Sequence, residues 1–336
     1  RILYFFSKNF IPGLILFVIN CIYFQYIRIK NYKWKDEDNS IHVVSYLFNL
    51  DIEKLNKGEF FSNQWKILPE KLKKNGKTIN WLHLLTKKGN FKNIKKTANL
   101  FNYINLNNDQ EKHYILESFT DLKLIIKVLN NFFKFQFFCW SKIKNLSCSF
   151  TTDNNYFLWN VFRNDIEKSF LGTVLINNLF YIFLFKKVIS SIPKKNSGLY
   201  LYESQSWEKA LLYFWNIYNK NEIIGVSHSS IKFWELQYFN IKKNRYNMQV
   251  NLPHKIFLNG RGAFDILKNA NQNMNIYCIV EALRYLYLKK YINKQKVFNY
   301  SKIKKILVLG DISSETSENM LESIIPFARE NQKNLV

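Results

Sequence analysis

Four polar side chains follow four predicted strands between residues 198 and 290, and their types suit proton transfer and the binding of a polar ligand. They are Glu203 after residues 198–202, His228 after 222–227, Asn259 after 255–258 and Glu281 after 275–280. Helical patterns separate these strands, which predicts a parallel sheet with right-handed connections. In open α/β sheets, ligands bind in the crevice outside the carboxyl ends of the strands. We therefore expect the four side chains to meet in one crevice at that edge.

His228 and Glu203 are the candidate catalytic residues. A histidine titrates near neutral pH, so His228 can accept a proton from an attacking hydroxyl group or donate a hydrogen bond to a phosphate oxygen. Glu203 is the competing base. A structural interpretation is also open, with His228 as a satisfied core histidine, Ser206 as a helix cap and Trp207 in the core. The remaining histidines do not share the position of His228 and are expected to be structural or exposed: His42, His83, His113 and His254.

Further residues near these two are expected to bind the substrate: Gln205, Ser229, Trp234, Asn259, Glu281 and Arg284. Gln205 places an amide beside Glu203 at the start of a predicted helix, where it can hold hydroxyl groups of a ligand. The turn 259–262 either approaches a phosphate or makes a tight bend, and its glycines favour the bend. Glu281 and Arg284 are three residues apart, so they can shape the cleft or form a salt bridge on one helix face.

Motifs of several other catalytic classes are missing from the sequence. It contains no P-loop, no GxGxxG and no GxSxG, and its five histidines and four cysteines are scattered. We therefore expect neither a metal ion nor a bound cofactor.

The formal net charge is +24, from 49 Lys and Arg against 25 Asp and Glu. Two explanations of this charge are open. One is a compositional bias toward lysine on solvated faces, and the other is the binding of an anionic partner, either a membrane surface or nucleic acid. The sequence has no arginine-rich patch, no zinc-finger spacing and no RNA-binding aromatic motif. Nucleic acid is therefore not an expected partner.

The hydrophobic pattern indicates which elements position the candidate residues. Residues 41–46 and 78–84 are typical of strands, and between them Trp65, Leu68 and Leu72 share one face of a predicted helix. Residues 90–190 are expected to be mostly helical. Together with the strands after residue 198, this pattern predicts an α/β fold with a Rossmann-like parallel sheet flanked by helices.

Residues 9–27 carry no charge, and a basic segment that contains Arg28, Lys30, Lys33 and Lys35 follows them. At about 1.5 Å per residue this stretch nearly crosses a bilayer core, and a basic flank is typical of the cytoplasmic side. Both a membrane-inserted or interfacial segment and a buried core helix remain open. The uncharged stretch 169–185 is shorter, which favours a core helix.

The motifs at 45–51 (SYLFNLD), 80–83 (NWLH), 198–208 (GLYLYESQSWE), 224–229 (IGVSHS) and 281–285 (EALRY) together resemble a bacterial family of surface carbohydrate biosynthesis proteins. The family comprises GT-B-like glycosyltransferases that act on O-antigen or capsule-type glycans, and the resemblance covers residues 41 to 310. The sequence departs from the family pattern at Ser204, where the family has Asn, and at Ser227, where it has Gln.

The resemblance implies a GT-B-type domain organisation. Residues 1–40 are expected to form a hydrophobic, membrane-associated segment with a basic flank, and 41–288 the acceptor-side N-terminal domain. Residues 289–305 are a basic linker, and 306–336 the truncated start of a second, donor-side Rossmann-like domain. Because the chain begins at Arg1 and its first methionine is Met248, we expect a fragment of a longer protein that does not transfer sugar by itself.

The implied function is glycosyl transfer in bacterial surface polysaccharide biosynthesis, at the cytoplasmic face of the inner membrane, by a peripheral or singly anchored protein. The expected partners are a nucleotide sugar as co-substrate, a glycan or lipid-linked acceptor, and an anionic membrane surface. Two alternatives belong to other classes: a non-catalytic scaffold of the glycan assembly machinery and a basic membrane-surface binding protein.

Overall fold

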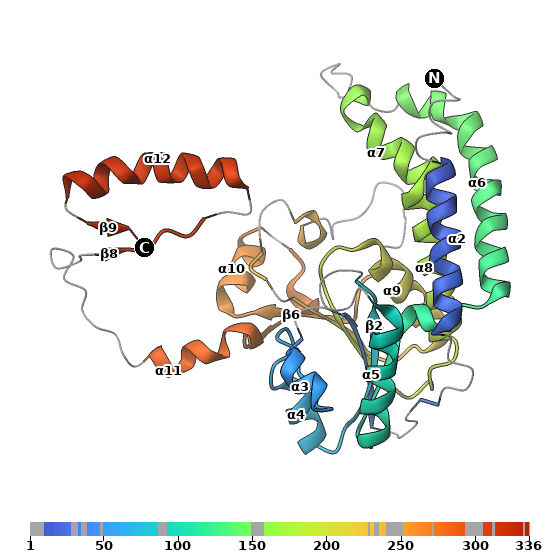
Figure 1. Cartoon of the computed structure of the whole chain (residues 1–336), viewed down its shortest axis with the longest axis horizontal. Coiled ribbons are helices and arrows are strands. Elements are labelled where there is room, and N and C mark those ends of the chain that lie inside the picture. The colour runs from blue at the N-terminus through green and yellow to red at the C-terminus, as the bar shows by residue number, and fades with distance from the viewer. Residues whose placement is uncertain are drawn as a thin grey trace. The chain divides into compact units, whose positions relative to one another are not determined.

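The computed structural model describes residues 10–27, 33–34, 39–47, 50–86, 93–148, 158–227, 229–231, 235–239, 251–270, 272–292, 305–310, 313–331 and 333–335. The chain divides into two compact units, residues 1–286 and 287–336. The first unit is built on a seven-stranded sheet and carries all the candidate site residues (Figure 1).

All neighbouring strands of this sheet are parallel, and their order is β3-β2-β1-β4-β5-β6-β7. The strands are β1 (Ser40–Tyr46), β2 (Thr78–Leu84), β3 (Glu111–Ile115), β4 (Ser197–Leu201), β5 (Ile223–Val226), β6 (Lys255–Asn259) and β7 (Tyr277–Val280). The chain builds outward from β1 to β3 and then returns to place β4 on the other side of β1. The strand order therefore reverses between β1 and β4, which is the position where open α/β sheets bind ligands. The predicted Rossmann-like α/β fold is confirmed.

Helices connect the strands. In the first unit they are α2 (Ile11–Tyr26), α3 (Ile52–Asn56), α4 (Leu68–Lys74), α5 (Ile94–Asn107), α6 (Leu122–Cys148), α7 (Trp159–Leu171), α8 (Thr173–Ile189), α9 (Ser206–Tyr218) and α10 (Arg261–Asn269). Short 3-10 helices lie at η3 (Leu116–Phe119), η4 (Leu236–Tyr238), η5 (Met274–Ile276) and η6 (Leu283–Leu288).

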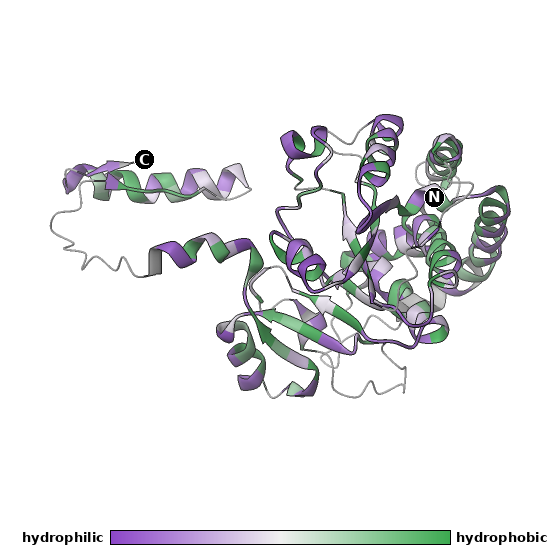
Figure 2. Cartoon of the chain, turned by 90° about the horizontal axis from the view of Figure 1, so that it is seen from below, coloured by the Kyte–Doolittle hydropathy of each residue, from purple (hydrophilic) through white to green (hydrophobic). Residues whose placement is uncertain are grey.

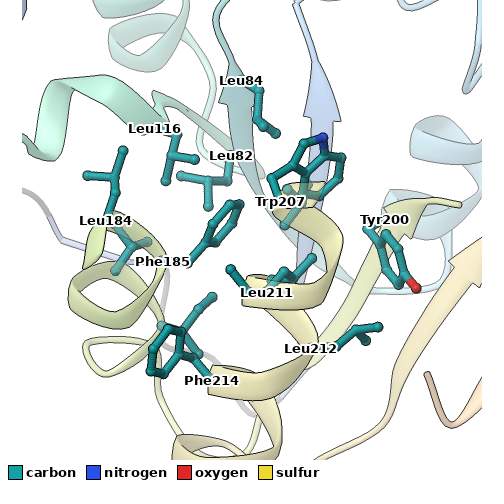
Figure 3. Close-up of a cluster of buried hydrophobic side chains, with 14 of the residues drawn as sticks. Leu82, Leu84, Leu116, Leu184, Phe185, Tyr200, Trp207, Leu211, Leu212 and Phe214 are labelled. Atoms are coloured by element: carbon teal, nitrogen blue, oxygen red, sulfur yellow. The ribbon is translucent and has the colours of Figure 1, made fainter. Parts of the chain in front are cut away.

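The two faces of the sheet pack against different helices because successive strand residues point to opposite sides. On one face, Val43, Leu199 and Val226 form a cluster with Trp65 and with residues of α4. On the other face, Val44, Tyr200 and Leu258 belong to the large core that includes α8, α9 and α10. Figure 3 shows how Phe185 of α8 and Trp207 of α9 lie together over this second face. Their rings are stacked with centroids 5.9 Å apart.

Helix α2 packs with one side against the core and exposes the other. Phe17, Cys21 and Phe24 are buried, and Phe17 and Phe24 both contact the ring of Phe180 on α8. Among the described residues, no single helix is both long and apolar enough to cross a bilayer. Helices α7 and α8 meet the criterion only as a pair, with a 45° bend between them. Residues 169–185 fall mostly in α8, whose inward residues are buried, as predicted for a core helix.

The sequence pattern misses one strand. Residues 90–190 are mostly helical, but they also contain β3. Its first residues, Glu111, Lys112 and His113, are polar and give no strand signal. Glu111 is nevertheless buried because its carboxylate accepts hydrogen bonds from Trp81 Nε1 (2.9 Å) and from the ammonium group of Lys73.

The second unit contains α11 (Lys289–Ile292), β8 (Lys305–Ile306), α12 (Ser314–Glu330) and β9 (Asn334–Leu335). Strands β8 and β9 pair in parallel, so these residues form one β-α-β unit. Helix α11 lies inside the predicted linker 289–305, and residues 293–304 of that linker are outside the described residues. The assignment of 306–336 to a donor-side domain stays a prediction.

Candidate functional site

A cavity of about 320 Å³ lies against the sheet face that α4 covers. We call it the central cavity. Its sheet wall consists of Leu199, Leu201, Ile224, Val226 and Phe257, and the segment 64–72 closes one side with Trp65, Leu68 and Leu72. The polar lining is Gln64, Ser227, Asn259, Glu281 and Arg284. The central cavity is thus an apolar hollow with hydrogen-bonding groups at the carboxyl ends of β5, β6 and β7, a combination typical of small-molecule sites.

Gln64 is the most unusual lining residue. Gln64 is 4% exposed, yet neither its amide nitrogen nor its amide oxygen has a hydrogen-bond partner among the described residues. A buried polar group without a partner costs about 1–3 kcal/mol. Because both amide atoms are themselves buried, the side chain must turn toward the cavity before they can pair with a ligand there.

The turn that carries Gln64 is held in place at the carboxyl end of β1. The Ser62 hydroxyl accepts hydrogen bonds from the backbone N–H groups of Gln64 (3.3 Å) and Trp65 (3.5 Å). The Trp65 indole N–H donates to the Ser45 hydroxyl (2.9 Å), and the Trp65 ring packs edge-on against Trp81. The backbone position of Gln64 is therefore fixed by the contacts of Ser62 and Trp65, not by hydrogen bonds of the Gln64 side chain.

Glu203 lies two residues beyond β4, at the point where the strand order reverses. Its side chain is half-buried, and burial raises the pKa of the Glu203 carboxyl group from 4.5 to about 7, against the opposing effect of the positive charge of Arg284. Arg284 lines the central cavity. A carboxyl group with a pKa near neutral pH is suited to act as a general base.

Glu208 positions the loop that carries Glu203. One oxygen of its carboxylate accepts hydrogen bonds from the backbone N–H groups of Glu203 (2.9 Å) and Gln205 (2.8 Å), and Ser204 between them has a φ of +65°. Burial raises the pKa of Glu208 to about 8, the two backbone hydrogen bonds oppose that shift, and the charge of Glu203 adds to it. Glu208 was not predicted from its sequence position, because a glutamate in the first turn of a helix is typically exposed.

The helix cap falls on Gln205, not on Ser206, which is the first residue of α9. Glu208 fixes this position because its carboxylate holds the Gln205 backbone N–H, as in a capping box. Gln205 itself is exposed and does not line the central cavity. Trp207 is 4% exposed, so its predicted place in the core is confirmed, and its indole N–H donates to Tyr46 Oη (2.6 Å).

A hydrogen-bond chain joins the ends of β5 and β6. The Tyr238 hydroxyl donates to Ser227 Oγ (3.0 Å), Ser227 Oγ donates to the Ser229 carbonyl (3.2 Å), and Asn259 Nδ2 donates to the same carbonyl (3.4 Å). Ser229 is thereby held beside Asn259 at the edge of the central cavity. Gly260 follows with a φ of +84°, which makes the turn 259–262 the tight bend that its glycines favour.

Of the four strand-end residues that were expected to meet, Asn259 and Glu281 line the central cavity together with Arg284. Glu203 is not part of this lining, but it lies within electrostatic reach of Arg284. Arg284 and Glu281 do not share a helix face, because Arg284 belongs to the 3-10 helix η6 and Glu281 precedes it. His228 and Trp234 lie outside the described residues. Their roles therefore stay predictions.

A second hollow, the α8–α9 groove, has a volume of about 670 Å³. Ser204 and Ser206 line it at the Glu203 loop, and Asn178, Tyr181 and Tyr213 line it along the helices.

Three of the remaining histidines are core residues. His42, His83 and His113 are each at most 2% exposed, and burial lowers the pKa of each imidazole well below 6.5. His83 Nε2 and His113 Nδ1 are 3.1 Å apart, and their rings stack between Trp81 and Phe101. All three imidazoles are neutral at physiological pH, and His83 and His113 belong to the packing of β2 and β3. Within the described residues, no group of three His, Cys, Asp or Glu side chains is arranged to hold a metal ion.

No protein-family model matches the chain, and the comparison with curated proteins finds no match. Among solved structures, the chain is similar to the crystal structure of UDP-GlcNAc 2-epimerase from Neisseria meningitidis bound to UDP-GlcNAc, with a TM-score of 0.39 and 10% sequence identity. The similarity covers 88% of this chain and 63% of that one, so the chain spans less than two thirds of the length of its neighbour. A TM-score of this size carries no argument about activity, and the fold assignment rests on the order and direction of the strands.

Proposed function

We propose that the first unit is the acceptor-side domain of a glycosyltransferase-like protein in bacterial surface polysaccharide biosynthesis. The protein transfers a sugar from a nucleotide-activated donor to a glycan or lipid-linked acceptor at the cytoplasmic face of the inner membrane. One observation carries the proposal: Glu203, whose carboxyl group has a raised pKa, follows the strand at which the strand order reverses and lies within electrostatic reach of Arg284, which lines the central cavity.

In the proposed reaction, the ionised Glu203 accepts the proton of an acceptor hydroxyl group. The hydroxyl oxygen then forms a bond to the anomeric carbon of the donor sugar, and the bond from that carbon to the diphosphate breaks. The nucleoside diphosphate leaves with the bonding electron pair. With a pKa of about 7, roughly half of the Glu203 carboxyl groups are ionised at neutral pH.

The lining of the central cavity supplies acceptor contacts in this proposal. Gln64 pairs with a donor and an acceptor group of the glycan, Asn259 and Glu281 bind hydroxyl groups, and Arg284 keeps Glu203 partly ionised. His228 remains the second candidate for the base or for a phosphate contact. Residues 306–336 begin the donor-side domain, so transfer requires the complete protein.

The test is sugar transfer by the complete protein with a panel of nucleotide sugars and acceptor glycans. Glu203→Gln should lower turnover by about 10²–10⁴-fold, the usual contribution of a general base. The matched control is Glu222→Gln, because Glu222 pairs with Lys255 (2.8 Å) where β5 and β6 begin, at the opposite edge of the same sheet. Normal turnover in Glu203→Gln contradicts the assignment of the base. Glycan binding without any transfer by the unaltered protein identifies a non-catalytic scaffold instead.

A further inference from the structure

Helices α2 and α6 expose large hydrophobic side chains. On α6, Phe133, Phe137 and Phe138 are 51%, 85% and 60% exposed. On α2, Ile15, Leu16 and Ile22 are each more than half exposed. We call these six side chains the outer helical surface. Monomeric soluble proteins rarely expose contiguous apolar patches of this kind without a binding partner.

The two helices lie together, so the exposed side chains belong to one region of the molecule. Phe10, which directly precedes α2, stacks on Phe132 of α6 with ring centroids 5.4 Å apart and contacts Phe133 edge-on at 6.2 Å. Figure 2 shows hydrophobic residues in green on the helices beside the N-terminal end, and Figure 1 shows α2 and α6 running side by side.

The exposed residues of α6 are not left over from imperfect packing. Leu124, Val128, Phe132 and Gln136 are spaced by four residues and are all buried, so they form an inward stripe of the helix, which Cys139 continues. Phe133, Phe137 and Phe138 lie outside that stripe. A soluble helix places polar residues at such positions, and the aromatic rings therefore indicate a second apolar environment.

The charges on these helices indicate the chemistry of the partner. Helices α2, α6 and α8 together contain seven lysines and no Asp or Glu. Lys123, Lys127 and Lys134 are exposed on α6, and the ammonium group of Lys127 lies 4.9 Å from the centre of the Phe183 ring. Aromatic side chains flanked by lysines fit the interface of an anionic bilayer, where rings reach the acyl boundary and ammonium groups meet lipid phosphates.

We propose that the outer helical surface inserts into one leaflet of a lipid bilayer that contains anionic lipid. In this proposal α2 and α6 lie in the interface, because α2 is a short apolar helix and α6 is not apolar along its length. One side of α2 then belongs to the core, where Phe17 and Phe24 pack on Phe180, and the other side contacts the membrane. Helix α8 packs against both α6 and α9, which begins at the Glu203 loop. Membrane binding rests on the exposed side chains alone and does not depend on the proposed function.

Vesicle co-sedimentation of the complete protein tests this proposal, with phosphatidylcholine vesicles that contain or lack phosphatidylglycerol. The unaltered protein should bind preferentially to the vesicles with phosphatidylglycerol. The double variant Phe137→Glu/Phe138→Glu should bind at least about tenfold more weakly, since two rings no longer enter the apolar boundary. Replacing Lys123, Lys127 and Lys134 with Gln should reduce the preference for phosphatidylglycerol, by about fivefold for each lysine that meets the headgroups.

Leu106→Glu on α5 is the matched control, because Leu106 is 84% exposed, like Phe137, but lies on neither α2 nor α6. It should bind vesicles as the unaltered protein does. Phe137, Phe138 and Leu106 are all exposed, so the double variant and Leu106→Glu should each keep the unfolding temperature of the unaltered protein. Failure of the unaltered protein to bind vesicles with phosphatidylglycerol overturns the proposal. Equal loss of binding in Leu106→Glu and the double variant also overturns it. A third contradicting result is self-association of the unaltered protein and of Leu106→Glu while the double variant is monomeric.

Discussion

Replacing Gln64 with methionine should separate stability from ligand binding. The Gln64 side chain is buried and both its polar atoms lack a partner. Methionine is unbranched and of similar size, so Gln64→Met removes an unsatisfied amide without opening a cavity. The desolvation penalty of such a group is about 1–3 kcal/mol. The free energy of unfolding should therefore rise by up to that amount, which corresponds to about 2–4 °C in Tm for each kcal/mol in a domain of 150–250 residues.

Ligand binding should change in the opposite direction. If the Gln64 amide pairs with a group of the acceptor glycan, Gln64→Met loses that interaction, and the same 1–3 kcal/mol corresponds to an increase in Kd of about 5–150-fold. Thermal unfolding by circular dichroism gives the first quantity. Calorimetric titration of the acceptor glycan into the complete protein gives the second.

Gln136 provides the comparison. It is also buried, but its amide nitrogen donates to the Leu171 carbonyl (2.9 Å), so Gln136→Met should lower the Tm. A decrease in Tm for Gln64→Met as large as that for Gln136→Met would show that Gln64 has a partner within the folded protein. Unchanged glycan affinity in Gln64→Met would remove Gln64 from the site.

Three further variants test the region around the Glu203 loop. The turnover of the unaltered protein should rise with pH through an apparent pKa near 7 as Glu203 ionises, and this rise should be absent from the residual activity of Glu203→Gln. His228→Ala should lower turnover by about 10²–10⁴-fold if His228 is the base, whereas near-normal turnover leaves Glu203 as the base. Glu208 has its pKa raised from 4.5 to about 8, so its contribution to stability is present at low pH and is lost as the pH rises from about 4.5 to about 8. Melting temperatures across that range should fall less steeply for Glu208→Gln, and an identical slope would contradict the raised pKa.

The strands that build the site were predictable because their residues follow a local hydrophobic pattern. Strand β2 has the predicted bounds, β1 and β6 differ from the prediction by one residue at one end, and β4 by one residue at each end. The placement of Asn259 and Glu281 at one edge then follows from the parallel direction of the strands. Strand β3 was missed because its pairing depends on Trp81 and Lys73, which are distant in sequence from Glu111.

The features that give the site its chemistry were not predictable in the same way. Gln64 is a single polar residue before a helix, and the lack of a partner for its amide is a property of the folded structure alone. Glu208 has no sequence signal beyond a helix start, because its burial results from the way the loop 203–205 folds back onto its carboxylate. The raised pKa of Glu203 likewise depends on burial, which is a property of the folded structure.

The most direct test of the proposed acceptor site is a crystal structure of the complete protein with an acceptor glycan and the nucleoside diphosphate bound. The account predicts that the glycan occupies the central cavity, with the Gln64 amide paired to it. One of its hydroxyl groups should lie about 2.6–3.2 Å from a carboxylate oxygen of Glu203, the distance required for proton transfer. A glycan bound elsewhere, with the central cavity empty and Glu203 out of reach of every hydroxyl group, would contradict the account.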